Sequence, residues 1–339
     1  MGAATQADAI LVTGGAGYIG SHVCQVLCDA GRQVVVLDDL SRGHRRQIPP
    51  GVTFVQGDIA DDALVGQLIA SHGIGWVMHF AGRILVPDSM RDPVDYYTTN
   101  VAKSLSLIAT CARAGIRGFV FSSTAAVYGT PAQLPVTEDT PCRPMSPYGH
   151  SKLMIEQMLA DIGQVSAMRF VCLRYFNVAG ADPQGRRGQR EDETTHLIRV
   201  ACQAAVGRRA FLEVFGDDYD TPDGTCIRDF IHVCDLAGVH YAALGYLDSG
   251  GKSTVINCGY GHGYSIREVI AAVERVTGRP LPVRQGGRRD GDIPAMVAAV
   301  GRMRALLDWS PRYDDLDQII RTALAWEESL NRTDAAGHG

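Results

Sequence analysis

Tyr148 and Lys152 are the residues whose types and spacing most directly suggest chemistry. They lie four positions apart at the start of a stretch with a helical pattern, so both side chains share one face of the predicted helix. A free tyrosine has a pKa of about 10, and a nearby positive charge favours its phenolate form. The spacing therefore predicts a tyrosine that accepts a hydroxyl proton near neutral pH. The alternative is an exposed pair with no function.

A hydroxyl-rich segment, Ser122-Ser123-Thr124, follows an apolar strand predicted over 119–121. Ligands of parallel sheets bind at the C-terminal ends of the strands. A hydroxyl group at this point can bridge a substrate oxygen and the tyrosine. The segment and the Tyr–Lys pair together form a candidate proton-transfer set.

A glycine-rich turn stands near the start of the chain. The run Gly15-Ala16-Gly17-Tyr18-Ile19-Gly20 separates a β-branched segment, 10–13, from a helix-like stretch, 21–30. Backbone N–H groups and the dipole at a helix N-terminus hold a pyrophosphate. A second strand, 33–37, ends in Asp38, whose carboxylate suits both ribose hydroxyls and repels a 2′-phosphate. We therefore expect NAD rather than NADP, against the alternative of a glycine turn without a nucleotide.

The elements that position these groups alternate between strands and helices. Near-continuous apolar strands between helices are typical of a buried parallel sheet. Beyond about residue 176 the elements become shorter, and a Gly/Arg-rich loop appears. The pattern predicts an α/β protein, with a Rossmann-type doubly wound parallel sheet and a smaller C-terminal α/β substrate-binding domain. Further strands are expected at 52–55 and 76–80, and helices at 61–71, from Asp92-Pro93 to about 114, after Ser265, and at 316–330.

Composition excludes several classes of protein. The 339 residues carry a net charge of −5 and no basic stripe, so nucleic acid is not an expected partner. No apolar run has the length of a membrane span, and no secretion signal is evident, so we expect a cytoplasmic protein. The nine cysteines are scattered without a C-x-x-C pair, and the ten histidines show no metal-ligand spacing. No metal site is expected.

The motifs together resemble the extended short-chain dehydrogenase/reductase superfamily, in which Ser/Thr, Tyr and Lys oxidise a carbinol by passing hydride to NAD⁺. Within it, the chain is similar to the UDP-glucose (UDP-galactose) 4-epimerase family. The resemblance spans about 10–327 and is carried by four segments: 13–22, 79–82, 173–177 and above all the long irregular block 214–233. It implies oxidation and re-reduction at C4 of a UDP-sugar, with NAD tightly retained.

The resemblance also implies a role for individual residues. It assigns the chemistry to Thr124, Tyr148 and Lys152. It implies that the cofactor is bound by Gly14, Gly17, Tyr18, Ile19, Gly20, Asp38, Asp58, Ile59, Phe80, Ala81, Gly82, Asn100, Ser122, Tyr148, Lys152 and Tyr175. It implies that the nucleotide-sugar is bound by Thr124, Tyr148, Asn177, His196, Leu197, Phe215, Arg228, Arg289, Asp292 and Met296. Guanidinium groups suit a diphosphate, although either arginine could instead form a surface ion pair with Asp229 or Asp292.

The implied organisation has an NAD-binding domain over 1–176 and a mainly nucleotide-sugar-binding domain over 177–331. Segments near 225–260 are candidates for returning to the first domain, and 332–339 is expected to be a disordered tail. A homodimer is implied, in which the helix from Pro93 and the helix of Tyr148 form a four-helix bundle with their twofold mates. Both helices carry apolar residues on more than one face, which favours a second partner.

Three positions depart from the family pattern. Ile84 stands where many members carry lysine, with Arg83 as a candidate replacement, and His196 stands where two asparagines are common. Met296 occupies the position of a residue that walls the sugar pocket. Because methionine is unbranched and adaptable, we expect slow turnover of UDP-N-acetylglucosamine beside the preferred UDP-glucose and UDP-galactose.

Three other functions compete with the epimerase hypothesis. A 4,6-dehydratase needs an acid and a base beside the catalytic hydroxyl, whereas Thr124 is followed by Ala125-Ala126. The sequence poorly distinguishes a UDP-glucose 4-epimerase from an epimerase that acts on UDP-pentoses or UDP-uronates. A non-catalytic NAD-sensing protein would not need to keep the intact Thr, Tyr and Lys set.

Overall fold

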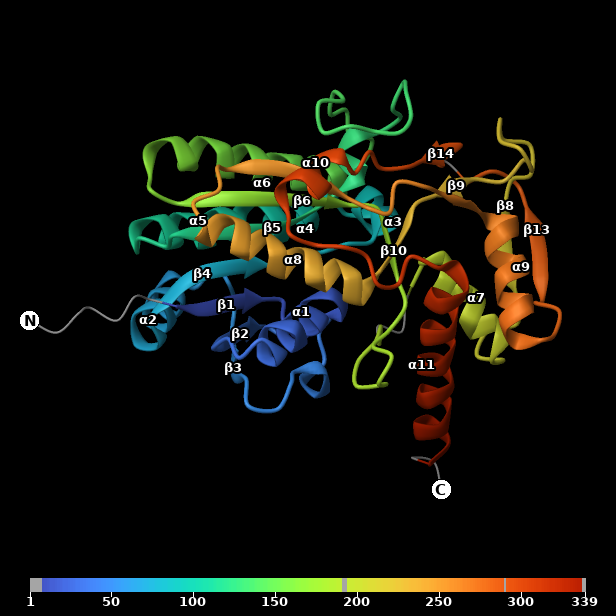
Figure 1. Cartoon of the computed structure of the whole chain (residues 1–339), viewed down its shortest axis with the longest axis horizontal. Helices are drawn as coiled ribbons and strands as arrows, with labels where there is room; N and C mark the ends of the chain where they lie inside the picture. Colours follow the sequence, from blue (N-terminus) through green and yellow to red (C-terminus); the bar gives the residue numbers. More distant parts are fainter. Residues whose placement is uncertain (1–7, 191–193, 290, 337–339) are drawn as a thin grey trace, which may run out of the picture.

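The computed structural model describes residues 8–190, 194–289 and 291–336. Its centre is a seven-stranded parallel sheet with the order β11-β6-β5-β4-β1-β2-β3 (Figure 1). Because the strand order reverses beside β1, a crevice opens there at the carboxyl ends of the strands. The strands are β1 Ala9–Thr13, β2 Val34–Asp38, β3 Thr53–Gln56, β4 Ile74–His79, β5 Gly118–Thr124, β6 Arg169–Tyr175 and β11 Thr254–Cys258.

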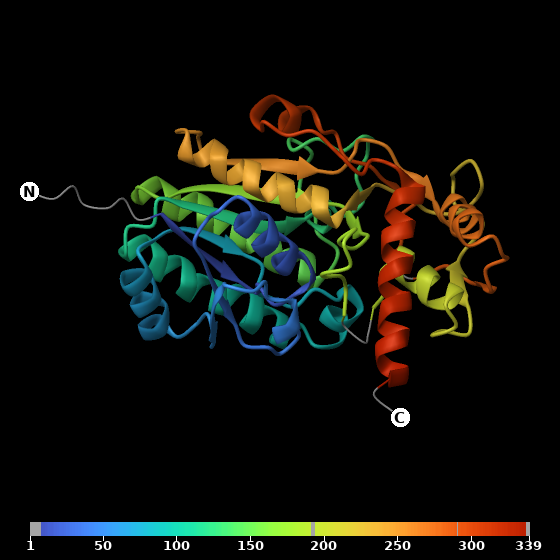
Figure 2. The same ribbon diagram turned by 60° about the horizontal axis from the view of Figure 1, so that its bottom comes forward.

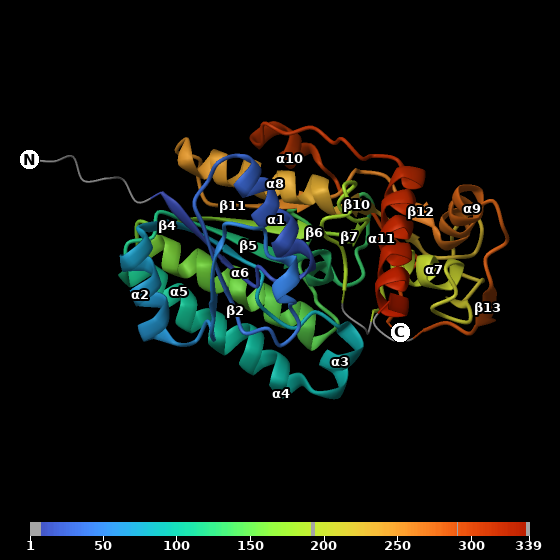
Figure 3. The ribbon, with the colours of Figure 1, turned by 90° about the horizontal axis from the view of Figure 1, so that it is seen from below.

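Side chains that alternate along the strands build a core on each face of the sheet. In β1, Ile10 and Val12 pack into one core, and Ala9 and Leu11 pack into the other. The first core is covered by α1 (Tyr18–Asp29) and α8 (Val233–Asp248). The second is covered by α2 (Asp62–His72), α5 (Lys103–Arg113) and α6 (Pro147–Val165), as Figure 3 shows from below. The predicted doubly wound sheet is therefore confirmed.

The helix predicted from Asp92-Pro93 is present but irregular. The Asp92 side chain accepts a hydrogen bond from the Asp95 N–H and begins α4, Pro93–Tyr96. A π-helical segment, Tyr97–Ala102, then joins α4 to α5. A preceding short helix, α3 (Val86–Arg91), was not predicted from the sequence. Its N-cap residue is Leu85, without a capping side chain among the described residues, and Pro87 in the first turn, with Asp88 after it, is the start signal that the sequence analysis missed.

A smaller group of elements lies beyond the carboxyl ends of the main strands (Figures 1 and 2). Ser265 begins α9 with a capping box, since its hydroxyl accepts from the Glu268 N–H and its own N–H donates to the Glu268 carboxylate. The strands pair as β7 with β10, β8 with β13, and β12-β9-β14. They are β7 Asn177–Ala179, β8 Leu212–Phe215, β9 Ile227–Arg228, β10 Phe230–His232, β12 Tyr264–Ser265, β13 Val283–Gly286 and β14 Ala295–Met296. The helices of this group are α7 Leu197–Ala205, α9 Ile266–Thr277 and α11 Leu316–Ala336. The short helix α10, Gly301–Leu306, packs beside β11, and the 3₁₀ turns Arg45–Gln47 and Ala125–Tyr128 follow β2 and β5 of the main sheet.

The C-terminal helix is longer than the sequence analysis expected. We predicted a disordered tail from 332, but α11 continues to Ala336. The segment 331–336 contains neither glycine nor proline, so nothing stops the helix before Gly337. The rest of the predicted tail, 337–339, lies outside the described residues. Within the described part of the chain, no helix is long and apolar enough to cross a membrane.

Candidate active site

An open cavity of about 1050 Å³ runs along the carboxyl ends of the strands. Its walls come from the ends of β1, β2, β4, β5 and β6, from α3 and α6, and from the first turn of α7. The cavity surface includes every residue that the sequence analysis assigned to catalysis, cofactor or substrate, except Asn100 and Phe215. The structure thus brings together residues that lie as far apart in the chain as Gly14 and Met296.

The glycine turn forms one end of the cavity. Gly14 has a φ of 71°, and a Cβ there would approach the Ala81 backbone, so a side chain is excluded on two grounds. Gly17 is the N-cap of α1, and no side chain of the described residues caps this helix end. The turn therefore leaves backbone N–H groups and the positive end of the helix dipole available for a pyrophosphate.

Asp38 is fixed beside this turn at the end of β2. Its carboxylate accepts hydrogen bonds of 2.9 Å from the N–H groups of Ala16 and Leu40. Burial raises the pKa of Asp38, and the two backbone hydrogen bonds oppose that rise. Each carboxylate oxygen keeps acceptor capacity for a ribose hydroxyl. The chemistry of this end of the cavity fits the adenosine half of NAD.

Asn100 supports the cavity wall instead of lining it. Its side chain accepts from the Arg83 N–H at 2.7 Å and donates to the Arg83 carbonyl at 3.1 Å and to the Ser151 hydroxyl at 3.0 Å. These bonds fix the loop that holds Gly82, and the expected direct contact of Asn100 with the cofactor stays a prediction. Arg83, the candidate replacement for the lysine that many members carry at the position of Ile84, lines the cavity and pairs with Asp95 at 3.0 Å.

The proton-transfer residues meet where β5 ends and α6 begins. Ser146 caps α6 by accepting a hydrogen bond from the Gly149 N–H, which places Tyr148 and Lys152 in the first two turns. The Lys152 ammonium donates to the Ser122 carbonyl at 2.9 Å and lies 6.0 Å from the centroid of the Tyr148 ring. The Thr124 hydroxyl accepts from the Ala126 N–H at 3.1 Å and lies near enough to the Tyr148 hydroxyl to favour its phenolate form. The predicted set of three side chains is therefore assembled.

Without a bound cofactor, the pKa of Tyr148 is raised. Burial raises this pKa to about 12, and Thr124 opposes the rise only in part. The expected lowering combined the Lys152 ammonium with the positive nicotinamide ring of bound NAD⁺, and it stays a prediction for the NAD-loaded protein. Burial also lowers the pKa of Lys152 to about 8, which the Glu156 carboxylate counters. The physical reason is that the site excludes water before any ligand charge enters it. A positive charge supplied by a bound cofactor is needed to favour the phenolate.

Two arginines line the opposite part of the cavity and share one carboxylate. Arg228 and Arg289 both pair with Asp292, at 3.6 Å and 2.8 Å. The ion pair with Asp292 that was considered for each arginine is therefore present. Asp229 is instead buried and accepts hydrogen bonds from backbone N–H groups. Phe215 lies under Arg289, with 5.3 Å between the guanidinium carbon and the ring centroid, which explains its absence from the cavity surface.

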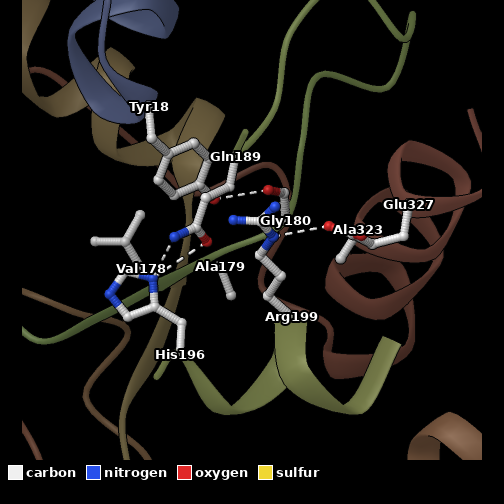
Figure 4. A pocket seen from close by; sticks show the side chains of 9 residues that line it. All are labelled: Tyr18, Val178, Ala179, Gly180, Gln189, His196, Arg199, Ala323 and Glu327. Atoms are coloured by element: carbon white, nitrogen blue, oxygen red, sulfur yellow. Dashed lines mark hydrogen bonds and ion pairs between the residues drawn. The ribbon is translucent and has the colours of Figure 1, made fainter. Parts of the chain in front are cut away.

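The remaining substrate candidates lie between these two ends. His196 and Leu197 open α7, Asn177 opens β7, and Met296 is a buried residue of β14. Burial and the nearby Arg199 guanidinium lower the pKa of His196 to about 4, so its imidazole is neutral. A second, small cavity of about 20 Å³ lies behind this histidine (Figure 4).

Several cavity residues were missed from the sequence. Gln189, Thr195 and Ser146 offer polar groups to the cavity, and Ala126 and Gly129 lie beyond Thr124. The Ser146-Pro147 pair is a helix-start signal that could have indicated Ser146. Gln189 stands in the Gly/Arg-rich loop, where no periodic pattern marks a side chain as buried.

The fold and the cavity define a class of protein: a Rossmann-fold enzyme that binds a dinucleotide beside a tyrosine–lysine proton-transfer set. The sequence model of the NAD dependent epimerase/dehydratase family matches residues 10–259, and the chain belongs to this family. This confirms the predicted family relationship and its NAD cofactor.

The relatives extend along nearly the whole chain. A UDP-glucose 4-epimerase of Azospirillum brasilense is 56% identical over 324 residues, which are 96% of this chain and 93% of the relative. The crystal structure of UDP-glucose 4-epimerase from Brucella ovis in complex with NAD is similar with a TM-score of 0.91, at 44% identity, over 94% of this chain and 98% of that one. The UDP-Glc/GlcNAc 4-epimerase from Campylobacter jejuni has a TM-score of 0.84 at 43% identity, over 95% and 99% of the two chains.

Proposed function

We propose that the protein interconverts UDP-glucose and UDP-galactose by transient oxidation at C4 of the sugar. The observation that carries the proposal is the geometry of one cavity. The glycine turn and Asp38 stand at one end, and Tyr148 with Lys152 stands beside an arginine-lined compartment. The UDP-glucose 4-epimerases that resemble this chain along nearly its full length support it.

The cofactor end follows from the turn and the carboxylate. The N-terminus of α1 holds the pyrophosphate of NAD, and Asp38 accepts from the adenosine ribose. Asp58, whose carboxylate pairs with Lys103 at 2.5 Å, stands with Ile59 at the adenine. Ser122, hydrogen-bonded to the Tyr175 hydroxyl, lies with Tyr175 at the nicotinamide end. Bound NAD⁺ supplies the hydride acceptor for C4 and the source of the returning hydride.

The chain's own residues move and hold the proton. Tyr148 accepts the proton of the sugar 4-hydroxyl through its phenolic oxygen, and Thr124 donates a hydrogen bond to the oxygens involved. Lys152 stabilises the phenolate by its charge and holds the end of β5 through the Ser122 carbonyl. Ala125 and Ala126, which follow Thr124 in the cavity wall, offer no acid for a dehydratase reaction.

The arginine compartment anchors the diphosphate. Arg228 is oriented by hydrogen bonds of 2.9 Å to the carbonyls of Ile227 and Ile293, and Arg289 is held by Asp292. Two guanidinium groups around one carboxylate leave a net positive charge, which suits a diphosphate. An anchor at the diphosphate lets the 4-keto sugar turn and present its other face for reduction.

Substrate breadth depends on Met296. This side chain is buried and lines the cavity, and an unbranched thioether can change rotamer to admit an acetamido group at C2. The relative from Campylobacter jejuni is described as a UDP-Glc/GlcNAc 4-epimerase, which supports slow turnover of UDP-N-acetylglucosamine.

We also propose a homodimer in the cytoplasm. Val94 on α4, Leu105 on α5 and Met154 on α6 are exposed, which favours burial of this face against a second copy. A dimer mass by light scattering at micromolar protein is expected, and a monomer mass would contradict it. The interior free thiols, such as Cys111 and Cys172, suit a reducing compartment.

The direct test combines cofactor analysis with turnover. We expect the purified protein to release NAD on acid denaturation and to convert UDP-galactose to UDP-glucose, with products from a panel of UDP-sugars resolved by chromatography. Release of NADP, or an empty protein that added NAD does not activate, would contradict the cofactor assignment. Activity on UDP-pentoses or UDP-uronates alone would replace the substrate assignment.

A further inference from the structure

The side chain of Gln189 lies directly behind His196 (Figure 4). Gln189 is buried, and its backbone carbonyl accepts a 2.8 Å hydrogen bond from the Trp326 indole N–H on α11. The backbone of this loop is therefore held independently of the glutamine side chain. The amide group is free to serve another purpose, and it faces the imidazole Nδ1.

Both atoms of the Gln189 amide group lie within hydrogen-bond distance of His196 Nδ1, the nitrogen at 2.8 Å and the oxygen at 3.1 Å. The nitrogen makes the shorter contact and also donates to the Thr194 hydroxyl at 3.3 Å, so we assign the bond to Nδ1 to the nitrogen. An amide nitrogen donates and does not accept, and this assignment therefore makes Nδ1 the acceptor. A neutral imidazole that accepts at Nδ1 carries its hydrogen on Nε2.

Burial keeps the histidine neutral, and the charged groups around it act in the same direction. Arg199, one turn along α7, pairs with Glu327 of α11 at 2.8 Å, and Arg208 pairs with the same carboxylate at 3.1 Å. The Tyr18 hydroxyl of α1, across the small cavity, donates to the Gly180 carbonyl at 2.6 Å. The Glu327 carboxylate, which lines the small cavity with His196, is therefore already shared by two guanidinium groups. Burial is the main cause that lowers the pKa of His196 to about 4, and the Arg199 guanidinium adds to it.

The Nε2 atom faces the large cavity. His196 lines both cavities. Its Nε2 atom has no hydrogen-bond partner within the described part of the chain, and this atom is accessible instead of buried. Leu197 and Ile198, at the N-terminus of α7, line the same wall, and Arg228 lines the cavity with them. A donor placed among these groups suits an anionic oxygen.

We propose that Gln189 is a positioning residue that holds His196 in the Nε2–H tautomer, so that a neutral histidine donates a hydrogen bond to a diphosphate oxygen of the substrate. The inference rests on the proposed function and adds a residue to it. Its consequence is that the Nε2–H donor is present in both protonation states of His196, because the neutral Nε2–H tautomer and the imidazolium each carry a hydrogen on Nε2.

The test replaces the amide with a carboxylate. In Gln189→Glu the carboxylate accepts a hydrogen from Nδ1 and raises the pKa of His196. Below that pKa the imidazolium donates from both nitrogens, and above it the remaining hydrogen moves to Nδ1, so Nε2 becomes an acceptor facing the diphosphate. Binding of UDP-glucose is measured by calorimetry between pH 5.5 and 8.5, on the NAD-loaded enzyme with Tyr148→Phe to stop turnover.

The matched control is Gln203→Glu. Gln203 is a buried residue of α7 whose side-chain oxygen accepts from Arg209 at 2.8 Å, so the same chemical change occurs away from His196. We expect a nearly flat dissociation constant in the parent and the control. In Gln189→Glu it should be close to the parent value at pH 5.5 and weaker by about tenfold or more at pH 8.5.

A second variant separates tautomer control from packing. Gln189→Leu keeps the side-chain size and the backbone bond to Trp326 but sets no tautomer, so binding should weaken at all pH values by the same factor. Parallel pH profiles for Gln189→Glu and the parent would overturn the proposal. If the parent itself fails to bind UDP-glucose while holding NAD, the proposed function fails instead, so the two failures are distinguishable.

Discussion

Replacing Lys152 by methionine should move the pH dependence of turnover upward. The ammonium lies 6.0 Å from the centroid of the Tyr148 ring, in a buried site. At an effective dielectric constant of about 20, one unit charge at this distance stabilises the phenolate by roughly 3 kcal/mol. Because 1.36 kcal/mol corresponds to one pKa unit, the apparent pKa of the tyrosine should rise by about two.

The assay is kcat for UDP-galactose between pH 6 and 10 on NAD-loaded enzyme. Turnover rises with pH as Tyr148 loses its proton, so the rising limb of the variant should lie about two pH units higher. At pH 7 the expected loss is about 100-fold, with recovery toward the parent rate at high pH. Lys103→Met is the matched control, because Lys103 lines the same cavity but pairs with Asp58 near the edge strand β3.

The refuting result is equally specific. A Lys152→Met enzyme whose rate falls by one factor at every pH would show that this lysine acts only through its hydrogen bond to the Ser122 carbonyl. A Lys103→Met enzyme with the same upward movement would show that the charge of the whole cavity, and not the ammonium beside the tyrosine, governs the base.

Three further predictions concern the chemistry, the pocket and the stability. Tyr148→Phe removes the base and keeps the ring, so turnover should fall by about 10² to 10⁴, and more than a tenth of the parent rate would assign the base elsewhere. Met296→Tyr places a rigid ring in the wall, so the ratio of kcat/KM for UDP-N-acetylglucosamine to that for UDP-glucose should fall, and an unchanged ratio would remove Met296 from the pocket wall. Glu327→Ala leaves the buried Arg199 without its carboxylate and should cost about 3–5 kcal/mol of unfolding free energy in denaturant titrations, whereas the exposed neighbour in Glu328→Ala should cost little, and equal losses would contradict this account.

The sequence predicted those features that depend on a few neighbouring residues. The glycine turn with Asp38, the helix start at Ser265, and the Tyr148 and Lys152 pair are all local patterns, and the structure has each of them. Strands of a buried parallel sheet are also recognisable from composition, because apolar side chains on both faces leave few polar positions.

Features set by distant contacts were not predictable in the same way. Asn100 supports the Arg83 loop through two hydrogen bonds to its backbone, which no pattern near Asn100 announces. The pKa of Tyr148 depends on how completely the fold excludes water, and the orientation of His196 depends on a glutamine in an irregular loop. The π-helical segment 97–102 has no composition signal either, since it shares the apolar spacing of the helix around it.

The central claim is that C4 of the sugar is oxidised and reduced again by the same bound cofactor. It is tested most directly with UDP-galactose that carries deuterium at C4, incubated in ordinary water with the NAD-loaded protein, and with mass spectrometry of the UDP-glucose formed. The account predicts that the product keeps the deuterium at C4, because hydride leaves and returns without exchange with solvent. Loss of the label to water, or incorporation of solvent hydrogen at C4, would contradict it.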